Sequence, residues 1–473
     1  MYSTVMLYII FLKTVSIVFS AAIFLSACKS NSKWEQLSEN PEFVHRSIKK
    51  VTDVMVADIY SPPVASRTYA YISIAGYEAG IQGDKNYVSL QKQLHGLDSL
   101  PKLLSLKAYS PALASSHAIL MVGKSLVFSE QKVKDFDAQL LEEFKAMGMP
   151  EEVYQNSISY ADSLAKRILK WASKDNYKQT RAMTKYSGSD EPGSWKPTPP
   201  SYMNAVEPFW HLIRPMIIDS ARQFKPEPAL AFSTDKQSQF YQEAVKVRDT
   251  GNNLTDEQVK IANFWDCNPF KMNIYGHVMY ATKKISPGGH WINITRLACQ
   301  KSKFDVAKTL EAYARLSITI SEGFISCWEE KFRSKVIRPE TYINQYMDES
   351  WVPALQTPPF PEYTSGHSVV SAASSIILTE LFGDNFQYAD STEVEFKIPV
   401  RHFKSFKQAA EEAAISRFYG GIHYMPSITN GLKEGNEIGN YITQKLITKK
   451  VSGVLAAVKS FKNCSARPNA QVY

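Results

Sequence analysis

The sequence has no run of like charges, no internal repeat and no low-complexity tract. Its 54 Lys and Arg residues exceed its 46 Asp and Glu residues by a net charge of +8, which is spread along 473 residues. A positive excess this dilute does not indicate nucleic acid as a partner, because nucleic-acid-binding proteins gather their positive charges in patches or runs. With 44% apolar and 12% aromatic residues, the chain is typical of a globular protein with one large core or two fused cores.

Alternating β-branched runs separated by hairpin turns are also lacking, which argues against a β-sheet fold. Apolar side chains recur instead at helical spacing over 133–144 and 161–171. The segment 306–331 contains no proline, and 408–419 is rich in Ala and Glu. The sequence therefore predicts an all-α protein.

Proline interrupts this pattern in clusters. The clusters at 191–200 and 224–228 cannot be helix interiors, so 185–230 is expected to form a long irregular excursion over the surface. It could serve as a lid or as a connector. A third cluster at 353–361 leads directly into one of the candidate functional stretches described below.

The first segment of the chain is almost uncharged. Residues 1–27 end in Leu25-Ser26-Ala27 before Cys28 and a polar stretch, which is typical of a signal peptide. The four residues also resemble a bacterial lipobox, in which Cys28 would become the acylated first residue of a lipoprotein. A transmembrane anchor is the alternative, since the apolar stretch is long enough to span a bilayer. Both predict an extracytoplasmic, membrane-anchored protein, in the periplasm or at the outer membrane or cell surface.

Cysteine is otherwise scarce. The remaining residues are Cys267, Cys299, Cys327 and Cys464. An oxidising compartment would allow this even number to pair. Three of them lie in apolar helical surroundings, so buried free thiols are an equal alternative.

Two stretches near the C-terminus combine a histidine with groups that bind anions. In the first, Ser365 and Gly366 precede His367 and an apolar segment over 368–382. We expect Ser365 and Gly366 at the N-cap and first turn of a helix, where amide N–H groups and the helix dipole favour an anion. The plain alternative is a capped helix with a surface histidine.

In the second stretch, Arg417 and His423 are too far around a straight helix to share one target. Gly420 and Gly421 between them are expected to end or bend the helix, which would let His423 turn back. A glycine C-cap followed by a solvent-facing histidine is the alternative.

Lys331 and Arg338 are separated by nearly two helical turns, so we expect them to project from one helix face. Pro339 is expected to end that helix and to place the Arg338 guanidinium at the C-terminal end of the helix. A charged helix end in water is the ordinary alternative.

Together these blocks occur in the order Lys331, Arg338-Pro339, Ser365-Gly366-His367, Ser416-Arg417 and His423. Their order and spacing resemble the three-part signature of the type 2 phosphatidic acid phosphatase and vanadium-dependent haloperoxidase superfamily. The resemblance covers roughly 261–431. More faintly, 61–71 is similar to the N-terminal helices of the haloperoxidase branch.

The resemblance implies a cofactor site. Vanadate, or phosphate in the same place, would be held by Lys331, Arg338, Ser365, Gly366, Arg417 and His423. His423 would coordinate vanadium or, in a phosphatase, attack phosphorus as the nucleophile. His367 would be the acid–base group on the opposite side, and Lys331 would polarise a bound peroxide.

Neighbouring residues extend the resemblance toward haloperoxidases. Trp328 and Phe360 resemble the aromatic lining of a haloperoxidase pocket, with ordinary core packing as an equal alternative. The stretch 264–266 resembles a segment whose aspartate, here Asp266, pairs with an active-site arginine, here Arg417.

One position departs from the phosphatase pattern, which places Asp four residues after the final histidine. This chain has Ser427 there, and serine cannot hold an imidazolium as a carboxylate does. The departure weighs against a phosphohistidine mechanism and leaves the partner that orients His423 unidentified. It could also mark an inactive relative.

We therefore expect an all-α lipoprotein of two fused helical bundles with long irregular loops, anchored to a membrane through Cys28. Its expected divisions are a signal peptide over 1–27, a first bundle half over 28–250 and a second over 251–473, which carries most of the site. The expected activity is that of a vanadate-dependent haloperoxidase with His367, Lys331 and His423 as catalytic residues. Its substrates would be hydrogen peroxide and a halide, with the resemblance favouring iodide or bromide over chloride.

Two alternatives stay open. The first is an acid phosphatase that hydrolyses a phosphomonoester through His423. The second is a non-catalytic surface lipoprotein that binds nutrients. In such a protein the spacing of the charged and histidine residues would have no functional role.

Overall fold

The computed structural model describes residues 33–103, 108–275 and 277–450. The signal peptide and lipidated Cys28 lie outside the described residues, as does Cys464, and these expectations stay predictions. Within the described ranges, none of the helices has the length and apolarity that a membrane span requires.

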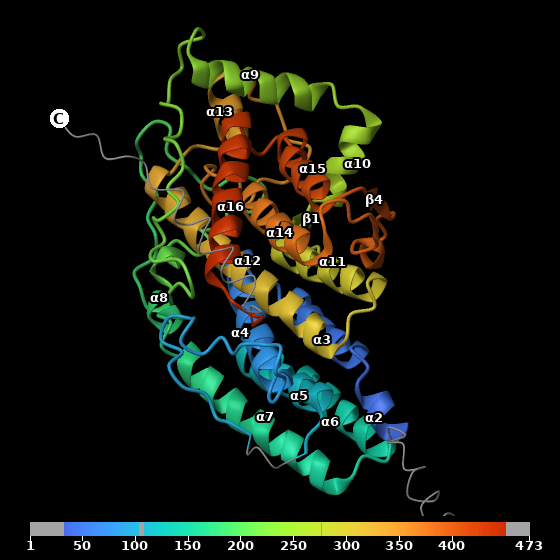
Figure 1. The fold of residues 1–473 in the computed structure, drawn as a ribbon. Coiled ribbons are helices and arrows are strands. Elements are labelled where there is room, and N and C mark those ends of the chain that lie inside the picture. The colour runs from blue at the N-terminus through green and yellow to red at the C-terminus, as the bar shows by residue number, and fades with distance from the viewer. Residues whose placement is uncertain (1–32, 104–107, 276, 451–473) are drawn as a thin grey trace, which may run out of the picture.

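The N-terminal half is a helical bundle, drawn in blue to green in Figure 1. Its helices are α2 (Lys33–Ser38), α3 (Glu42–Ala57), α4 (Pro62–Gly80), α5 (Pro111–Leu126), α6 (Glu130–Ala146), α7 (Glu151–Ala172) and α8 (Tyr177–Arg181). Helix α4 is buried along its whole length. It begins as the sequence favours, because the Ser61 hydroxyl caps it and prolines occupy its first turn.

The C-terminal half is a second group of helices. They are α9 (Gln239–Asn252), α10 (Asp256–Phe264), α11 (Pro287–Lys301), α12 (Val306–Ser334), α13 (Pro339–Tyr346), α14 (Gly366–Phe382), α15 (Phe406–Tyr419) and α16 (Met425–Lys445). Helix α12, with 29 residues, runs between the two halves and packs against α4 on one side and α14 on the other (Figure 1). One apolar core continues through both halves. The expected boundary near residue 250 stays a prediction.

The all-α prediction is confirmed. Helices α6, α7, α12 and α15 cover the segments whose periodicity or composition predicts helix. Two small antiparallel hairpins were not expected: β1 (Met272–Tyr275) pairs with β2 (Val278–Ala281), and β3 (Tyr388–Asp390) pairs with β4 (Arg401–Phe403). Strands of three or four residues are too short to produce a readable alternation.

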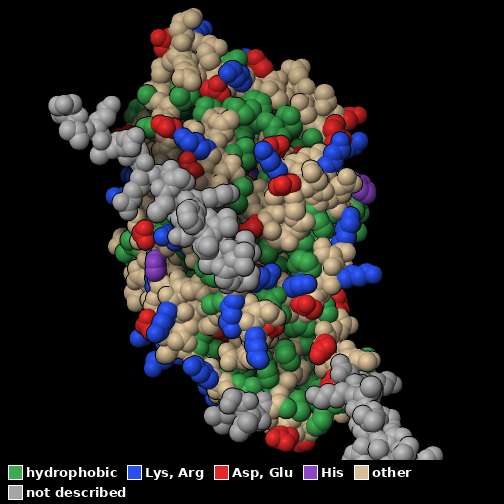
Figure 2. Space-filling view, viewed as in Figure 1, with side chains coloured by type: hydrophobic (Ala, Val, Ile, Leu, Met, Phe, Trp, Pro, Cys, Tyr) green, Lys and Arg blue, Asp and Glu red, His purple; other side chains and the backbone are tan. Residues whose placement is uncertain are grey.

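The irregular backbone expected over 185–230 is present, but it does not lie wholly on the surface, since Trp195, Trp210 and Ile218 are buried. Between α8 and α9 the described chain contains only one short 3-10 helix, η1 (Trp210–Leu212). The excursion is attached to the second half, since the Val206 N–H donates to the Pro359 carbonyl at 3.0 Å and the Trp195 N–H to that of Lys335 at 2.7 Å. On the face shown in Figure 2, charged side chains of both signs are interspersed.

Candidate active site

Lys331 is fully buried in the last turns of α12. Its ammonium donates to the carbonyls of Pro361, Glu362 and Thr364 at 3.0, 3.1 and 2.5 Å. Burial lowers the pKa of Lys331 to about 8. Three carbonyls use all three N–H groups of an ammonium, so contact with an anion requires one of these bonds to be given up.

Arg338 does not share a helix with Lys331. Helix α12 ends at Ser334, Lys335 adopts a left-handed conformation (φ 54°), and Arg338 is the N-cap residue of α13. The expectation that Pro339 ends a helix is wrong, because proline at the first helical position suits a helix start. Arg338 is nonetheless buried, and it donates to the Phe360 carbonyl at 2.9 Å through Nε.

His423 lies between α15 and α16 and has a partner at each ring nitrogen. Nε2 lies 3.1 Å from Arg338 Nη1, while Nδ1 lies 2.7 Å from Glu362 Oε1 and 3.3 Å from Ser427 Oγ. Because a guanidinium N–H can only donate, Nε2 accepts and the ring proton sits on Nδ1, facing Glu362. Burial and the charge of Arg338 lower the pKa of His423 well below its ordinary value. The ring is therefore neutral, with the lone pair that a metal needs on Nε2.

The turn that positions His423 is the expected one. Helix α15 ends at Tyr419, Gly420 is its C-cap residue and Gly421 has a φ of +73°. That conformation favours glycine and reverses the chain direction. Arg417, in the last turn of α15, is buried and donates from Nη1 to the Trp265 carbonyl at 2.6 Å.

The expected N-cap is also present. The Ser365 hydroxyl accepts a hydrogen bond from the Ser368 N–H at 3.4 Å, and α14 begins at Gly366. His367 follows in the first turn. Burial and the nearby Arg417 charge lower the pKa of His367 well below its ordinary value, so this ring is also neutral.

A narrow cavity of about 30 Å³ joins these elements. Its wall includes Trp328, Phe360, Gly366, His367, Arg417 and His423. The Trp328 and Phe360 rings are in contact, with centroids 4.9 Å apart. The volume is about twice what one water needs, which suits a small anion better than an organic molecule.

A wider cavity of about 480 Å³ adjoins the narrow one, since Phe270 lines both. Tyrosines line the wider one as well, namely Tyr60, Tyr177 and Tyr186. This volume is in the range of small-molecule pockets. The narrow cavity has a mostly apolar wall that carries two histidines and one arginine, and the wider cavity has an aromatic wall.

Asp266 does not pair with Arg417 as the sequence comparison predicts. Its ion pairs go to Lys284 at 2.8 Å and Lys271 at 3.6 Å. The Trp265 carbonyl, one residue earlier, binds Arg417 instead. The Asp266 charge still acts on Arg417, since it opposes the lowering of the arginine pKa by burial.

Two buried carboxylates in this region escaped the sequence-based prediction. Glu362 contacts His423 as described, and Glu434 of α16 accepts hydrogen bonds from Ser326 and Thr364, both at 2.8 Å. Burial raises the pKa of each carboxylate to about 7. Glu362 lies in the same short stretch of sequence as His367. That proximity was the signal from which a role for Glu362 in the site could have been predicted.

The described cysteines do not form disulfides. Cys267, Cys299 and Cys327 are buried free thiols. This agrees with the second of the two alternatives considered for them.

Comparisons with known proteins identify the family of the chain. A family model described as the VCPO second helical-bundle domain matches residues 311–451. The chain is similar to a solved structure described as the first bacterial vanadium-dependent iodoperoxidase, with 47% identity and a TM-score of 0.81. That alignment covers 87% of this chain and 97% of the other. The chain belongs to the vanadium-dependent haloperoxidase family.

More distant members share the haloperoxidase fold. The holo-type structure of a bacterial vanadium-dependent chloroperoxidase has 16% identity and a TM-score of 0.62, over 82% of this chain and 93% of that one. The apo-type structure has 18% identity and a TM-score of 0.60, over 81% and 92%. Among curated proteins no match was found.

The residues of this haloperoxidase family member fit vanadate. Among the described residues, none is a hydrogen-bond partner of Arg338 Nη2, His367 Nε2 or Arg417 Nε, although all three atoms are buried. His367 and Arg417 line the narrow cavity, and Arg338 contacts His423, which lines it too. Unpaired buried polar atoms cost free energy, so their grouping here indicates a polar ligand. Two guanidinium groups beside a neutral imidazole suit a multiply charged oxyanion.

Proposed function

We propose that this chain is a vanadate-dependent haloperoxidase that oxidises a halide with hydrogen peroxide to hypohalous acid, with iodide preferred to bromide and chloride. The observation that carries the proposal is His423, whose neutral ring offers Nε2 beside unpaired atoms of Arg338, Arg417 and His367. The preference for iodide rests on the similarity to the iodoperoxidase. When bound, vanadate would supply a Lewis acid that activates peroxide without a change of oxidation state.

The protein's own residues would then divide the work. His423 Nε2 would be the ligand atom, and Arg338, Arg417 and the helix N-terminus at Ser365 and Gly366 would stabilise the negative charge. Lys331 would join them once it leaves one of its carbonyl partners. These roles are supported by the burial of the charged side chains, by the cavity that Gly366, Arg417 and His423 line, and by the contact of Arg338 with His423.

His367 would carry the proton. Its Nε2 is buried without a partner among the described residues, and its ring is neutral because burial and Arg417 lower its pKa. A neutral ring at the cavity wall can accept a proton and return it. Trp328 and Phe360 would exclude water and favour a weakly hydrated halide.

An acid phosphatase remains a second candidate because of one observation. Ser427 weighed against a phosphohistidine, but Glu362 supplies a carboxylate to His423 Nδ1 from a different part of the chain. A carboxylate in that place stabilises a cationic histidine as well as it orients a metal ligand. The departure at Ser427 therefore does not separate the two activities.

A direct comparison tests the proposal. The protein is incubated with orthovanadate, and peroxide-dependent oxidation of iodide and bromide is compared with hydrolysis of a nitrophenyl phosphate ester. We expect halide oxidation that depends on vanadate and is faster with iodide. Ester hydrolysis alone, without vanadium retained by the protein, would overturn the proposal in favour of the phosphatase.

Two substitutions test the division of roles. His423→Ala should abolish vanadium retention, because it removes the ligand atom. His367→Ala should leave retention nearly unchanged and lower turnover, because it removes only the proton carrier. Equal loss of bound vanadium in both variants would contradict these roles.

We also propose that the protein is extracytoplasmic and anchored to a membrane by a lipid on Cys28, after removal of 1–27. The proposal rests on the residues 25–28, which resemble a lipobox. Mass spectrometry of the mature N-terminus and membrane fractionation test it. A mature N-terminus other than Cys28, or a Cys28 without the added mass of a lipid, would contradict lipidation.

A further inference from the structure

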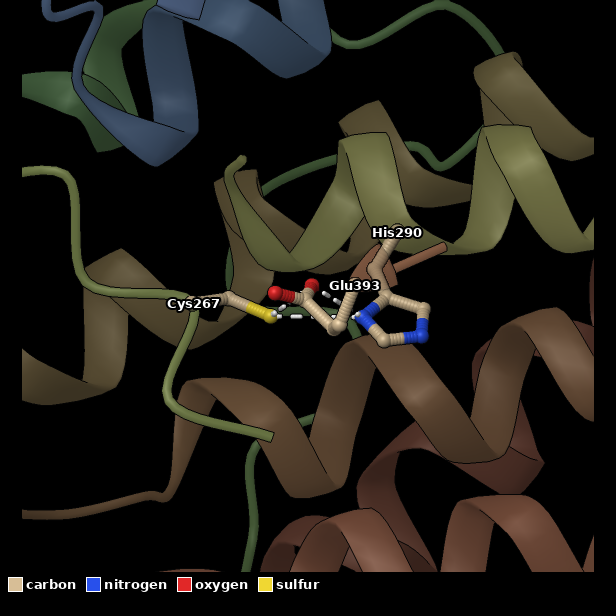
Figure 3. A group of neighbouring side chains, drawn as sticks. All are labelled: Cys267, His290 and Glu393. Carbon is tan, nitrogen blue, oxygen red and sulfur yellow. Dashed lines mark hydrogen bonds and ion pairs between the residues drawn. The ribbon is translucent and has the colours of Figure 1, made fainter. Parts of the chain in front are cut away.

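Cys267, His290 and Glu393 form a compact buried cluster (Figure 3), and Cys267 also lines the narrow cavity. The Cys267 sulfur lies 3.4 Å from His290 Nδ1 and 3.9 Å from Glu393 Oε1, and these nitrogen and oxygen atoms are 3.1 Å apart. The three side chains come from the loop after α10, from α11 and from the residue before the 3-10 helix η2 (Val394–Phe396). Each is at most 2% exposed.

These distances are close to those between the ligand atoms of a tetrahedral metal ion. Zinc bonds of about 2.3 Å to sulfur and about 2.0–2.1 Å to nitrogen and oxygen place ligand atoms about 3.3–3.6 Å apart. The observed separations lie on both sides of that range and require only small shifts to meet it. Thiolate, imidazole and carboxylate are also the ligand types that zinc takes.

The other nitrogen of His290 is held as in many metal sites. Nε2 lies 2.9 Å from Asp390 Oδ2, and Asp390 is itself fixed by the Thr392 N–H at 2.9 Å. A carboxylate on the distal nitrogen orients the ring and directs the Nδ1 lone pair toward a metal. This contact leaves Nδ1 as the atom that faces Cys267 and Glu393.

The charge of the cluster also favours a cation. Asp390 and Glu393 are both buried, and within the described part of the chain both of their ion pairs go to the same imidazole, that of His290. Two buried carboxylates around a single imidazole are costly, because each charge has lost its water. A divalent ion among these ligands would offset that cost.

We propose that Cys267, His290 and Glu393 bind one divalent transition-metal ion of the zinc class, with solvent as the fourth ligand. This site is separate from the proposed vanadate site and adds a second metal to the protein. Cys267 also lines the narrow cavity, so solvent can reach it from there.

The site would position part of the haloperoxidase centre. Cys267 follows Trp265 by two residues, the Trp265 carbonyl accepts the hydrogen bond from Arg417, and the Trp265 ring stacks on His290 with centroids 4.5 Å apart. A metal at Cys267 and His290 would hold this segment from both sides. It would fix Arg417 without contacting the reactants.

Metal analysis of the full chain tests the proposal. The protein is purified without chelators and its zinc content is measured, and it is then stripped and reloaded with Co²⁺. We expect close to one zinc per chain and, with cobalt, the ligand-field bands of a tetrahedral ion and a thiolate-to-cobalt charge-transfer band. A protein that neither retains zinc nor binds it when zinc is supplied in excess would overturn the proposal.

Substitutions identify the ligands. Cys267→Ser should remove the charge-transfer band and weaken zinc binding at least about tenfold, whereas Cys299→Ser, a change at another buried free thiol, should leave both unchanged. If Cys267→Ser fails to fold, Glu393→Gln provides the same comparison of zinc affinity. Zinc retained with unchanged affinity in a folded Cys267 or Glu393 variant would overturn the assignment.

The same measurement separates this proposal from the proposed function. Vanadium and zinc are counted together in the wild-type protein after loading with orthovanadate. Vanadium without zinc overturns the second metal site alone. Zinc without vanadium supports it and overturns the proposed cofactor alone.

Discussion

At the scale of single residues, Glu362 controls the orientation and the tautomer of the His423 ring. Its carboxylate lies 2.7 Å from Nδ1 and 3.1 Å from the Tyr424 N–H, so it holds both the ring and the backbone next to it. This fixes the tautomer that leaves Nε2 free of a proton. Ser427 contacts the same ring nitrogen at 3.3 Å, a longer and weaker bond.

Glu362→Gln should therefore weaken vanadate binding about 10–100-fold, the usual cost of losing a charged partner of a metal-bound histidine. The amide keeps the shape and can still accept the Nδ1 proton, but it lacks the charge that makes the ring a strong ligand. Vanadium retained after dialysis at several vanadate concentrations measures the effect.

Ser427→Ala is the matched control, because it removes the other contact to the same nitrogen. We expect a loss of less than about tenfold from it, in line with one weak neutral hydrogen bond. A larger loss from Ser427→Ala than from Glu362→Gln would show that the hydroxyl orients the ring.

The residues of the site divide into those that the sequence could predict and those that it could not. Ser365, Gly366 and Gly420 have local causes, since caps and glycine turns are encoded within a few residues. The contact between Glu362 and His423 joins positions 61 residues apart, and it depends on the path of the intervening chain. Neither the periodicity of the apolar residues nor the spacing of the motifs predicts that path.

At the scale of helices, α14 and α16 approach closely because of glycine. A Cβ atom added at Gly435 would lie 2.2 Å from the Val369 carbonyl oxygen and 2.8 Å from the Ala372 side chain. The first neighbour is backbone, so it cannot move aside without shifting a helix. This contact supports the N-terminal turn of α14, where Ser365 and His367 lie.

Gly435→Ala should lower the free energy of unfolding by about 2 kcal/mol or more, because overpacking against a backbone atom forces two helices apart. Chemical denaturation measures the change. Gly323→Ala in α12 is the control, since its nearest neighbours would be 3.7 Å away. That change should be neutral or should stabilise by up to about 1 kcal/mol, as expected for alanine in a helix.

His117 connects three helices of the first bundle half. It lies on α5, and its ring nitrogens are 2.8 Å from Asp137 of α6 and 3.4 Å from Asp162 of α7. Burial disfavours its charged form, but hydrogen bonds to the two carboxylates outweigh burial and raise the pKa of His117 to about 9. The folded state therefore holds the proton more tightly than the unfolded state, whose histidine has a pKa near 6.5.

This contribution to stability is fully present below about pH 6.5 and is lost as the pH rises through about 9. The difference in unfolding free energy between wild type and His117→Gln should therefore be largest at low pH and shrink by up to about 3 kcal/mol across that window. Denaturation of both proteins at a series of pH values checks the sign. A difference that grows with pH would contradict a charged His117.

Helices α6, α7, α12 and α15 could be predicted because each carries its own periodicity or composition. The separation of Lys331 from Arg338 could not, because seven residues are compatible with one helix or with a helix, a turn and a new start. The left-handed Lys335 decides between them, and lysine gives little local signal for that conformation.

At the scale of the whole molecule, the site concentrates buried positive charge. Lys331, Arg338 and Arg417 are each at most 1% exposed, and burial lowers the pKa of all three. A lowered pKa of a cation means that its charge is destabilising in the folded state. A bound anion should therefore stabilise the entire fold.

Orthovanadate should raise the thermal unfolding midpoint, and its concentration dependence should follow mass action, with about 2.7 kcal/mol gained at a hundredfold excess over the dissociation constant. Phosphate should raise it less, because it offers no metal for His423. In His423→Ala the vanadate effect should fall to that of phosphate, and sodium chloride at equal ionic strength is the control. Equal effects of vanadate in wild type and His423→Ala would contradict coordination by His423.

The two-bundle arrangement was expected from the resemblance rather than from the pattern of residues. Periodicity predicts which faces of α4 and α12 are apolar, but α4 is buried on every side, which only the surrounding helices explain. The continuous core through both halves likewise depends on long-range packing. The amino-acid composition is equally compatible with one continuous core and with two separate cores.

The hydrogen bond between Arg338 Nη1 and His423 Nε2 has a consequence for how the protein acquires its cofactor. The nitrogen proposed to coordinate vanadium already accepts a hydrogen bond from Arg338. Binding of an oxyanion at Nε2 would require the Arg338 guanidinium to give up this contact, and the freed N–H group could then donate to the oxyanion. At high concentrations of the incoming ion, the speed of that withdrawal, rather than the frequency of collisions, would set how quickly the enzyme becomes active.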